Sequence, residues 1–156
     1  MKITIMNGNG DPQNGEFNAY VTRLAAKLMG EGHAVTAFTL RDLDIKFCTG
    51  CFGCWVKTPG QCVVKDASHD VCRAVINGDF LLWAAPLRMG FPDATLKKMM
   101  DKSIPLIHPY FEVVHGEAHH RPRYDRYPRV GLLLQRKRTP MPKTCASWAT
   151  SSAAPR

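Results

Sequence analysis

Lys2-Ile3-Thr4-Ile5-Met6 runs directly into Asn7-Gly8-Asn9-Gly10. The first run is short, apolar and rich in β-branched residues, and the glycines and asparagines after it are typical of a loop, so a strand is expected to end near residue 6. Apolar residues then recur at helical spacing over residues 17–29, two glycines end this helix, and residues 34–40 alternate as a second strand. This order predicts a parallel βαβ unit.

The rest of the chain continues the alternation of strands and helices. Residues 66–69 can cap a helix with one apolar face, and residues 80–85 are apolar on both sides, as a central parallel strand must be. Pro86 is expected to end that strand, Asp93 to cap a helix over residues 94–102, and residues 130–134 to form a fourth strand. We therefore predict an α/β fold with a doubly wound parallel sheet in one domain, residues 1–135.

Three loops lie at the carboxyl edge of the predicted sheet, where doubly wound sheets bind their ligands: residues 7–17, a cysteine-rich loop at 47–65, and residues 86–93. The first of these loops leads straight into a helix, and its amides together with the helix N-terminus can cradle a phosphate. It lacks the glycine spacing of a dinucleotide fingerprint and of a Walker loop. An ordinary turn is the alternative interpretation.

Four of the six cysteines fall within one short stretch, at Cys48, Cys51, Cys54 and Cys62. Their C-x2-C-x2-C-x7-C spacing suits a [4Fe-4S] cluster. Zinc is a second possibility, although structural zinc sites usually separate two ligand pairs more widely. Unligated thiols are the third. No secretion signal is visible, so metal or redox chemistry is favoured over structural disulfides.

Charge and hydropathy exclude two classes of protein. The formal net charge is +8, but the five basic residues after Gln135 account for +5 of it, and the body carries +3. Because basic and aromatic residues do not interleave, we expect no nucleic-acid partner. The longest apolar run, residues 80–87, is too short for a membrane span. A soluble, cytoplasmic protein is expected.

The last residues, 136–156, depart from the pattern of the rest of the chain, because they contain basic residues but no acids and no periodic apolar face. Moving the reading frame back by one base turns residues 137–154 into an acidic helix start followed by apolar residues at helical spacing. We hypothesise that this tail is frameshifted and the fold C-terminally truncated. The strand at 130–134 would then form a less protected sheet edge.

Four of the six histidines cluster late in the chain, at His108, His115, His119 and His120. His119 and His120 are adjacent, so on an extended chain they point in opposite directions and do not readily chelate one metal ion. With nearby arginines they favour a basic surface or a subunit contact over a metal site. A homo-oligomer is therefore expected.

Several motifs together resemble a known family. They are the phosphate-type loop at 7–18, the cysteine run with Trp55, Pro59-Gly60-Gln61-Cys62, Lys65-Asp66, Ala85-Pro86-Leu87-Arg88-Met89-Gly90, Leu96-Lys97, Asp101-Lys102, Gly116-Glu117-Ala118-His119-His120 and Arg123-Tyr124. As a set, covering about residues 1–135, they resemble the flavodoxin-like NAD(P)H-dependent FMN reductases. Within that superfamily the chain is also similar to the iron-sulfur flavoproteins.

The resemblance implies where FMN would bind. Its phosphate is expected against Asn9, Phe17 and Asn18. Its isoalloxazine edge is expected along Pro86, Leu87, Arg88, Met89 and Gly90. Arg88 stands where many relatives have an aromatic residue that stacks on the flavin, and its guanidinium can stack on the ring, favour an anionic reduced flavin, or be an ordinary surface arginine.

The function implied is that of an NAD(P)H-dependent FMN oxidoreductase, which passes electrons from nicotinamide through FMN to a small-molecule or protein acceptor. Because the flavin carries this chemistry, no catalytic side chain is expected. The first alternative is an iron-sulfur flavoprotein that carries electrons with a [4Fe-4S] cluster on the four loop cysteines. The second is a non-catalytic flavodoxin-like remnant.

Overall fold

The computed structural model describes residues 1–136, so the expectations for the tail from residue 137 onward lie outside the described residues. In chain order the elements are β1 (Lys2–Asn7), α1 (Gly15–Gly30), β2 (Ala34–Thr39), η1 (Leu40–Asp42), α2 (Gly53–Val56), α3 (Ser68–Ile76), β3 (Phe80–Arg88), β4 (Phe91–Pro92), α4 (Ala94–Asp101), η2 (Ile104–Leu106), β5 (Ile107–Val114), β6 (Glu117–Pro122) and β7 (Arg129–Gln135).

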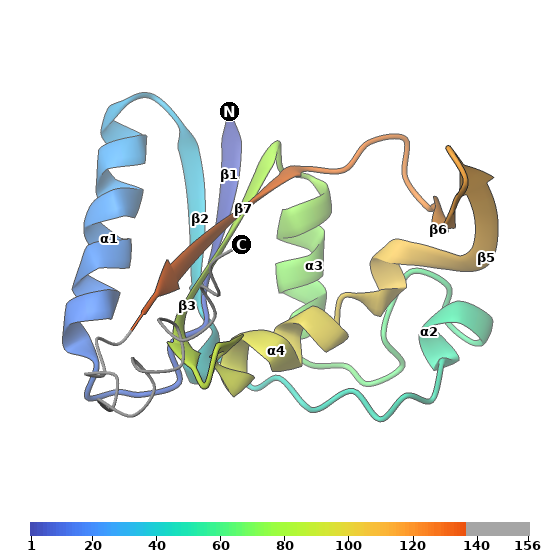
Figure 1. Ribbon diagram of the computed structural model, residues 1–156, viewed down its shortest axis with the longest axis horizontal. Coiled ribbons are helices and arrows are strands. Elements are labelled where there is room, and N and C mark those ends of the chain that lie inside the picture. Colours follow the sequence, from blue (N-terminus) through green and yellow to red (C-terminus); the bar gives the residue numbers. More distant parts are fainter. Residues whose placement is uncertain (137–156) are drawn as a thin grey trace, which may run out of the picture.

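The main sheet places β1 between β2 and β3, and β7 lies on the far side of β3 (Figure 1). All three pairings in this order are parallel, with Met6 opposite Phe38 in β2 and opposite Trp83 in β3. α1 packs on one face of the sheet, while α3 and α4 pack on the other (Figure 1). This arrangement confirms the predicted α/β fold with a doubly wound parallel sheet.

Each face of the sheet has its own apolar core. Beneath α1 the buried residues are Ile3, Ile5, Phe17, Val21, Ala25 and Ala84. Beneath α3 and α4 they are Met6, Leu40, Ile45, Val71, Val75, Leu81, Ala85, Leu96, Met99 and Leu106. β1 and β3 contribute to both cores, which explains why these two strands are apolar on both sides. No helix among residues 1–136 is long and apolar enough to cross a membrane.

Pro86 does not end the third strand, and that prediction was wrong. β3 continues to Arg88, and Pro86 lies opposite Gln135 in the ladder with β7. A proline lacks an N–H group but keeps an extended φ and a free carbonyl. The Pro86 carbonyl accepts from the Asp93 amide at 3.1 Å, so the strand runs on into the short antiparallel pairing with β4.

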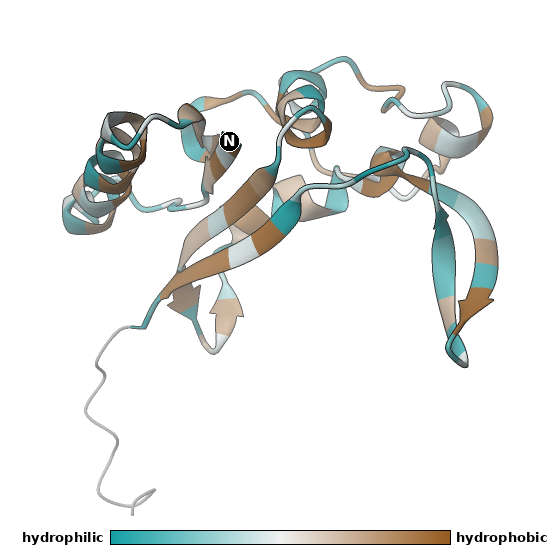
Figure 2. Ribbon diagram, turned by 90° about the horizontal axis from the view of Figure 1, so that it is seen from above, coloured by the Kyte–Doolittle hydropathy of each residue, from teal (hydrophilic) through white to brown (hydrophobic). Residues whose placement is uncertain are grey.

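A β-hairpin stands beside the main sheet, where the sequence had predicted no regular element. β5 and β6 pair antiparallel with each other and form a separate sheet (Figure 2). His115 and Gly116 connect them, both with positive φ, as two-residue hairpin turns require. The indole of Trp55 donates to the carbonyls of Ile104 and Ile107 and attaches the base of this hairpin to α2.

The loop after β1 passes so close to α4 that a glycine is needed there. A Cβ on Gly8 would lie 2.4 Å from the Leu96 Cβ and 3.0 Å from its Cα. Since Leu96 is fully buried on α4, neither backbone can move away freely. The Gly8 amide also donates to the Ala84 carbonyl at 2.7 Å, which fixes the loop to β3.

We expect Gly8→Ala to lower the free energy of unfolding by about 2–3 kcal/mol, because the new methyl group overpacks the contact with α4. Urea denaturation measures the change. Gly15→Ala is the matched control, since a Cβ at Gly15 meets nothing within 4 Å. Equal stability of Gly8→Ala and the wild type would show that the loop is not held against Leu96.

Candidate functional site

Asparagine side chains organise the loop after β1 from within. The amides of Asn7 and Asn9 both donate to Asn18 Oδ1 at 3.0 Å. Asn9 also donates to the Asn14 carbonyl at 3.1 Å, and its own Oδ1 accepts from the Asp11 amide at 3.2 Å. These bonds join the asparagine side chains to one another and to the loop backbone, and they fix the path of the loop into α1.

The three residues predicted to contact a phosphate face inward. The side chains of Asn9 and Phe17 are buried, and both amide hydrogens of Asn9 are used in the bonds above. Turned by 180°, the Asn18 amide would accept from Arg41 at 2.9 Å, so it is engaged within the protein in either orientation. Their contact with a phosphate stays a prediction. The backbone amides of Gly15 and Glu16, which begin α1, are the donors that helix geometry leaves free there.

The loop at residues 86–90 lies at the same carboxyl edge and is largely open to solvent. Pro86 is buried and Leu87 half-buried, whereas Met89 is 98% exposed. Met89 and Gly90 have φ values of 52° and 84° and turn β3 back into β4. The loop therefore presents its backbone outward from the end of a central strand.

A cavity of about 660 Å³ lies where these two loops meet. Its lining consists of Asp11, Asn14, Pro86, Leu87, Arg88, Met89, Gly90 and Arg136. The structure thus brings all five predicted ring-contact residues together with the loop after β1. Asn9, Phe17 and Asn18 are not among the lining residues, although Asn9 and Asn18 support the loop that carries Asp11 and Asn14.

These residues fit a flavin nucleotide. The volume lies within the range of about 300–1,000 Å³ typical of ligand pockets. The lining combines polar and charged side chains, at Asp11, Asn14, Arg88 and Arg136, with the apolar side chains of Pro86, Leu87 and Met89 and with Gly90. A Cβ built at Gly90 meets nothing within 4 Å, so a planar ring has room to approach that backbone.

Arg88 has partners that the sequence analysis missed. Its Nε donates to Asp93 Oδ2 at 3.0 Å and its Nη2 to Asp11 Oδ2 at 3.3 Å. The hydrogen bond and charge of Asp93, and then those of Asp11, raise the pKa of Arg88. Burial would raise the pKa of Asp93, but the Thr95 amide and Arg88 lower it. Arg88 and Asp11 are 77 residues apart, so only the fold shows that they meet.

The four loop cysteines line one small cavity. It has a volume of about 30 Å³ and includes Cys48, Cys51, Cys54 and Cys62 in its lining, together with other residues of the loop and Ile104 of η2. Phe52, in a left-handed conformation before α2, also lines this cavity and stacks on Trp55 with 5.0 Å between the ring centroids. Among residues 1–136, however, no group of three or more His, Cys, Asp or Glu side chains is arranged to hold a metal ion.

Two of these thiols differ in acidity. The backbone of Gly53 and the Thr49 hydroxyl lower the pKa of the exposed Cys51 thiol. Burial and the neighbouring sulfurs, first that of Cys62, raise the pKa of Cys54. The sulfurs therefore lie close enough to influence one another, and Cys51 is the more readily ionised of the two.

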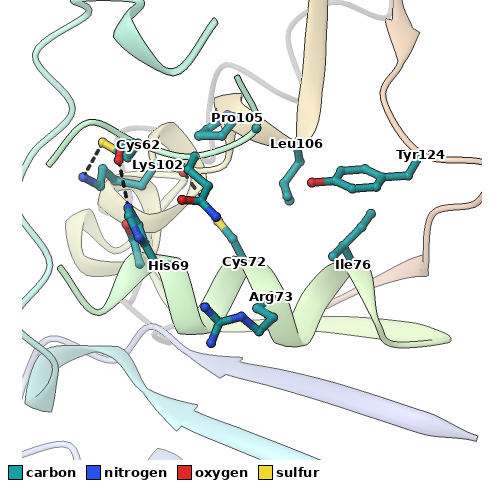
Figure 3. A pocket seen from close by; sticks show the side chains of 12 residues that line it. Cys62, His69, Cys72, Arg73, Ile76, Lys102, Pro105, Leu106 and Tyr124 are labelled. Atoms are coloured by element: carbon teal, nitrogen blue, oxygen red, sulfur yellow. Dashed lines mark hydrogen bonds between the residues drawn. The ribbon is translucent and has the colours of Figure 1, made fainter. Parts of the chain in front are cut away.

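A buried ion pair anchors the end of the cysteine loop. Lys102 Nζ lies 3.0 Å from Asp66 Oδ2 and 3.0 Å from Cys62 Sγ, and the side chains of Lys102 and Asp66 are each 1% exposed. Figure 3 shows Lys102 and Cys62 at one end of a second cavity, about 120 Å³, between α3 and the segment leading into β5. Cys62 lines both cavities. The sequence placed Lys65-Asp66 and Asp101-Lys102 among its motifs but did not predict this contact.

Burial raises the pKa of Asp66, but hydrogen bonds from Ser68, the Lys46 amide and Lys102 outweigh it and hold that pKa well below its usual range. For Lys102 the balance is similar: burial lowers its pKa, and the bonds to Cys62 and Asp66 raise it. Both groups are therefore charged at neutral pH.

The four histidines at 108, 115, 119 and 120 lie in the hairpin and do not converge. His119 and His120 point to opposite faces of β6, as expected from their adjacency. His119 Nε2 lies 3.3 Å from Glu117, whereas His120 Nδ1 bonds to the His108 carbonyl at 2.8 Å. The His120 ring packs against Trp55 and Phe111. These contacts give His120 a structural role, and the predicted subunit contact stays a prediction.

The fold and the cavity at its carboxyl edge define a flavodoxin-like α/β domain. Two solved structures share this fold. An azoreductase from Bacillus anthracis superposes with a TM-score of 0.61 at 13% identity, covering 87% of this chain and 69% of that one. A structure described as a putative quinone reductase from Klebsiella pneumoniae gives 0.57 at 16% identity, covering 87% and 59%.

The chain belongs to the NADPH-dependent FMN reductase family, whose model matches residues 1–115. It is also 27% identical over 106 residues to an iron-sulfur flavoprotein of Methanocaldococcus jannaschii, covering 68% of this chain and 53% of that protein. With an iron-sulfur flavoprotein of Archaeoglobus fulgidus it shares 27% over 100 residues, covering 64% and 44%. The chain thus spans about half the length of these curated relatives.

The Asp66–Lys102 pair predicts how stability changes with pH. An aspartate whose pKa is lowered by folding stabilises the protein above its unfolded pKa of about 3.9, and this stabilisation is lost as the pH falls toward the folded value. We expect Asp66→Asn to be less stable than the wild type at pH 7 by about 3–5 kcal/mol, because it leaves a buried ammonium unpaired. It should also lose less stability than the wild type on acidification.

Urea unfolding at a series of pH values measures both effects. Asp70→Asn is the control, because Asp70 pairs with Arg73 on the surface and both side chains are well exposed. If the wild type and Asp66→Asn declined in parallel on acidification, the proposed contribution of Asp66 would be excluded.

Proposed function

We propose that this chain is an FMN-binding domain of an NAD(P)H-dependent oxidoreductase. The observation that carries the proposal is the cavity of about 660 Å³ formed by residues 86–90 and the loop after β1. Membership of the NADPH-dependent FMN reductase family supports it. In a doubly wound sheet this is the edge at which ligands bind.

In this proposal, residues 86–90 face the flavin ring, and the loop after β1 with the start of α1 holds the phosphate. The amides of Gly15 and Glu16 point from a helix N-terminus, which favours an anion. Asn9 and Asn18 act indirectly, by fixing the loop. Asn14 donates to the Gln135 side chain at 2.8 Å and joins that loop to β7.

When bound, FMN supplies hydride acceptance from a nicotinamide nucleotide and electron delivery to an acceptor. The residues of this chain need supply no general acid or base for that chemistry. Their part is to hold the ring against the exposed backbone of residues 89–90 and to leave its outer face open. Gly90, at which a Cβ would meet nothing within 4 Å, and Met89, which is 98% exposed, match that requirement.

The partners in this proposal are a nicotinamide nucleotide and a small-molecule or protein electron acceptor, with a homo-oligomer as the assembly. A reducing cytoplasm is the proposed location, because the five cysteines within residues 1–136 are all free thiols.

FMN titration of the purified protein, followed by quenching of flavin fluorescence, tests the site. We expect Gly90→Val to weaken FMN binding by about tenfold or more, because a branched side chain fills the space where the ring approaches. Gly116→Val is a matched control, since Gly116 has a φ of 85° against 84° for Gly90 and equally open surroundings, but lies in the hairpin.

Equal losses in the two glycine variants would contradict the assignment of the cavity. A wild-type protein that binds no FMN would instead support the non-catalytic alternative. NADH and NADPH oxidation with FMN-loaded protein then tests the oxidoreductase activity.

The second candidate function is an iron-sulfur electron carrier. One observation favours it: the four cysteines, although far from ideal for a single metal ion, line one cavity at the edge of the domain. A [4Fe-4S] cluster is held by four such thiolates, and because a cavity of about 30 Å³ has room for about one water molecule, this loop would have to open to hold it. The curated relatives named above are iron-sulfur flavoproteins.

Protein purified without air distinguishes the two functions by its iron and acid-labile sulfide content. If the cluster is present, Cys51→Ala should lose most of the bound iron, whereas Cys72→Ala should retain it, because Cys72 lies on α3 and does not line the four-cysteine cavity. Absence of iron and sulfide from the wild type would eliminate the cluster.

A further inference from the structure

We propose that Arg88 is a positioning residue of the flavin site, which ties the loop after β1 to the start of α4 and offsets one of the two negative charges of Asp11 and Asp93, so that an anionic phosphate can bind. This inference rests on the proposed FMN site. It differs from the expectation that Arg88 stacks on the flavin ring.

Asp11 and Asp93 each share their carboxylate between Arg88 and a backbone amide. Asp11 uses Oδ1 to accept from the Gln13 amide at 2.9 Å and Oδ2 to accept from Arg88. Asp93 uses Oδ1 to accept from the Thr95 amide at 3.0 Å and Oδ2 to accept from Arg88. Each aspartate therefore shapes its own backbone with one oxygen and binds the guanidinium with the other.

The two segments that Arg88 joins are already in close contact, because the backbone at Gly10 lies against the side chains of Thr95 and Asp93. A Cβ on Gly10 would lie 2.5 Å from Thr95 Oγ1 and 2.7 Å from Asp93 Oδ1. The loop after β1 thus rests on the N-terminal turn of α4, and Arg88 connects both from the end of β3. A planar guanidinium can bond to two carboxylates at once, which a lysine ammonium does less well.

The charges at this edge of the sheet oppose an anion unless they are offset. Asp11 lines the cavity, and Asp93, whose side chain is 8% exposed, binds the same guanidinium. Without Arg88 these two carboxylates would repel a nearby anion, because like charges at short range oppose one another. Arg88 offsets one of the two negative charges before the ligand arrives, and Arg136, which also lines the cavity, is a second cation there.

The geometry also limits a stacking role. The Nε of Arg88 donates to Asp93 and one Nη donates to Asp11, which lie in two different segments. The side chain lines the cavity and is 52% exposed. Stacking on a flavin ring would require the guanidinium to leave at least one of these carboxylates. If Arg88 is a positioning residue, its loss should weaken the binding of a flavin that carries a phosphate more than the binding of one that does not. If Arg88 stacks on the ring, its loss should weaken the binding of both equally.

The experiment compares FMN with riboflavin, which has the same ring but no phosphate. Dissociation constants are measured for the wild type, Arg88→Ala, Arg88→Lys and the double variant Arg88→Ala/Asp11→Asn. We expect Arg88→Ala to weaken FMN binding about tenfold and riboflavin binding less than twofold. Arg88→Lys should lie between the wild type and Arg88→Ala, and the double variant should recover much of the FMN affinity.

Arg126→Ala is the control, because Arg126 pairs with Asp79 on the surface at the opposite end of β3. Equal losses of FMN and riboflavin in Arg88→Ala, or no recovery in the double variant, would overturn the inference. If the wild type bound riboflavin but gained nothing from the phosphate of FMN, the inference would fail while a flavin site remained. If it bound neither flavin, the proposed function would fail and the inference with it.

Discussion

The close approach of the loop after β1 to α4 is the constraint on which the site depends. Gly8 and Gly10 lie where any side chain would collide with Leu96, Thr95 or Asp93. Because both positions lack a Cβ, the loop after β1 can rest directly on a helix that follows β3. β1 and β3 are neighbours in the sheet, so this contact brings the loop and residues 86–93 to one edge. The cavity is lined by residues of these two segments, Asp11 and Asn14 from one and residues 86–90 from the other.

The cysteine loop depends on a different kind of anchor. Much of it is exposed, with little apolar area to hold it, and the buried contact of Lys102 with Asp66 and Cys62 fixes the point where it enters α3. A buried ion pair is costly to form, but breaking one partner of a formed pair is more costly still. The pair therefore gives this loop a definite position relative to α4. That position keeps the four cysteines on one side of the domain, whichever chemistry they perform.

The periodicity of the sequence was sufficient to predict the main sheet and its helices, because β1, α1, β2, α3, β3 and α4 each combine an apolar pattern with a capping or turn residue. Asp93 illustrates this, since it caps α4 as expected through the Thr95 amide. Most of the features that the sequence did not predict depend on contacts between residues far apart in the chain. Pro86 continues a strand because β7 and Asp93 complete its pairing, and the hairpin was hidden in a segment with no strong alternation. The ion pairs of Arg88 and Lys102 join residues far apart in the chain, which local patterns do not report.

The proposed flavin site requires no catalytic side chain, because the cofactor supplies the chemistry. In that proposal the ring would lie against the exposed backbone of residues 89–90, and the loop that would hold the phosphate is fixed by asparagine amides that bond to one another. Such a loop carries its own acid, Asp11, which orders the chain through the Gln13 amide but brings a negative charge to an anion site. A cation is then needed close by, and it must bond to the carboxylate without displacing the backbone that the carboxylate shapes. Arg88 meets both conditions from the end of a central strand, where its position is set by the sheet itself.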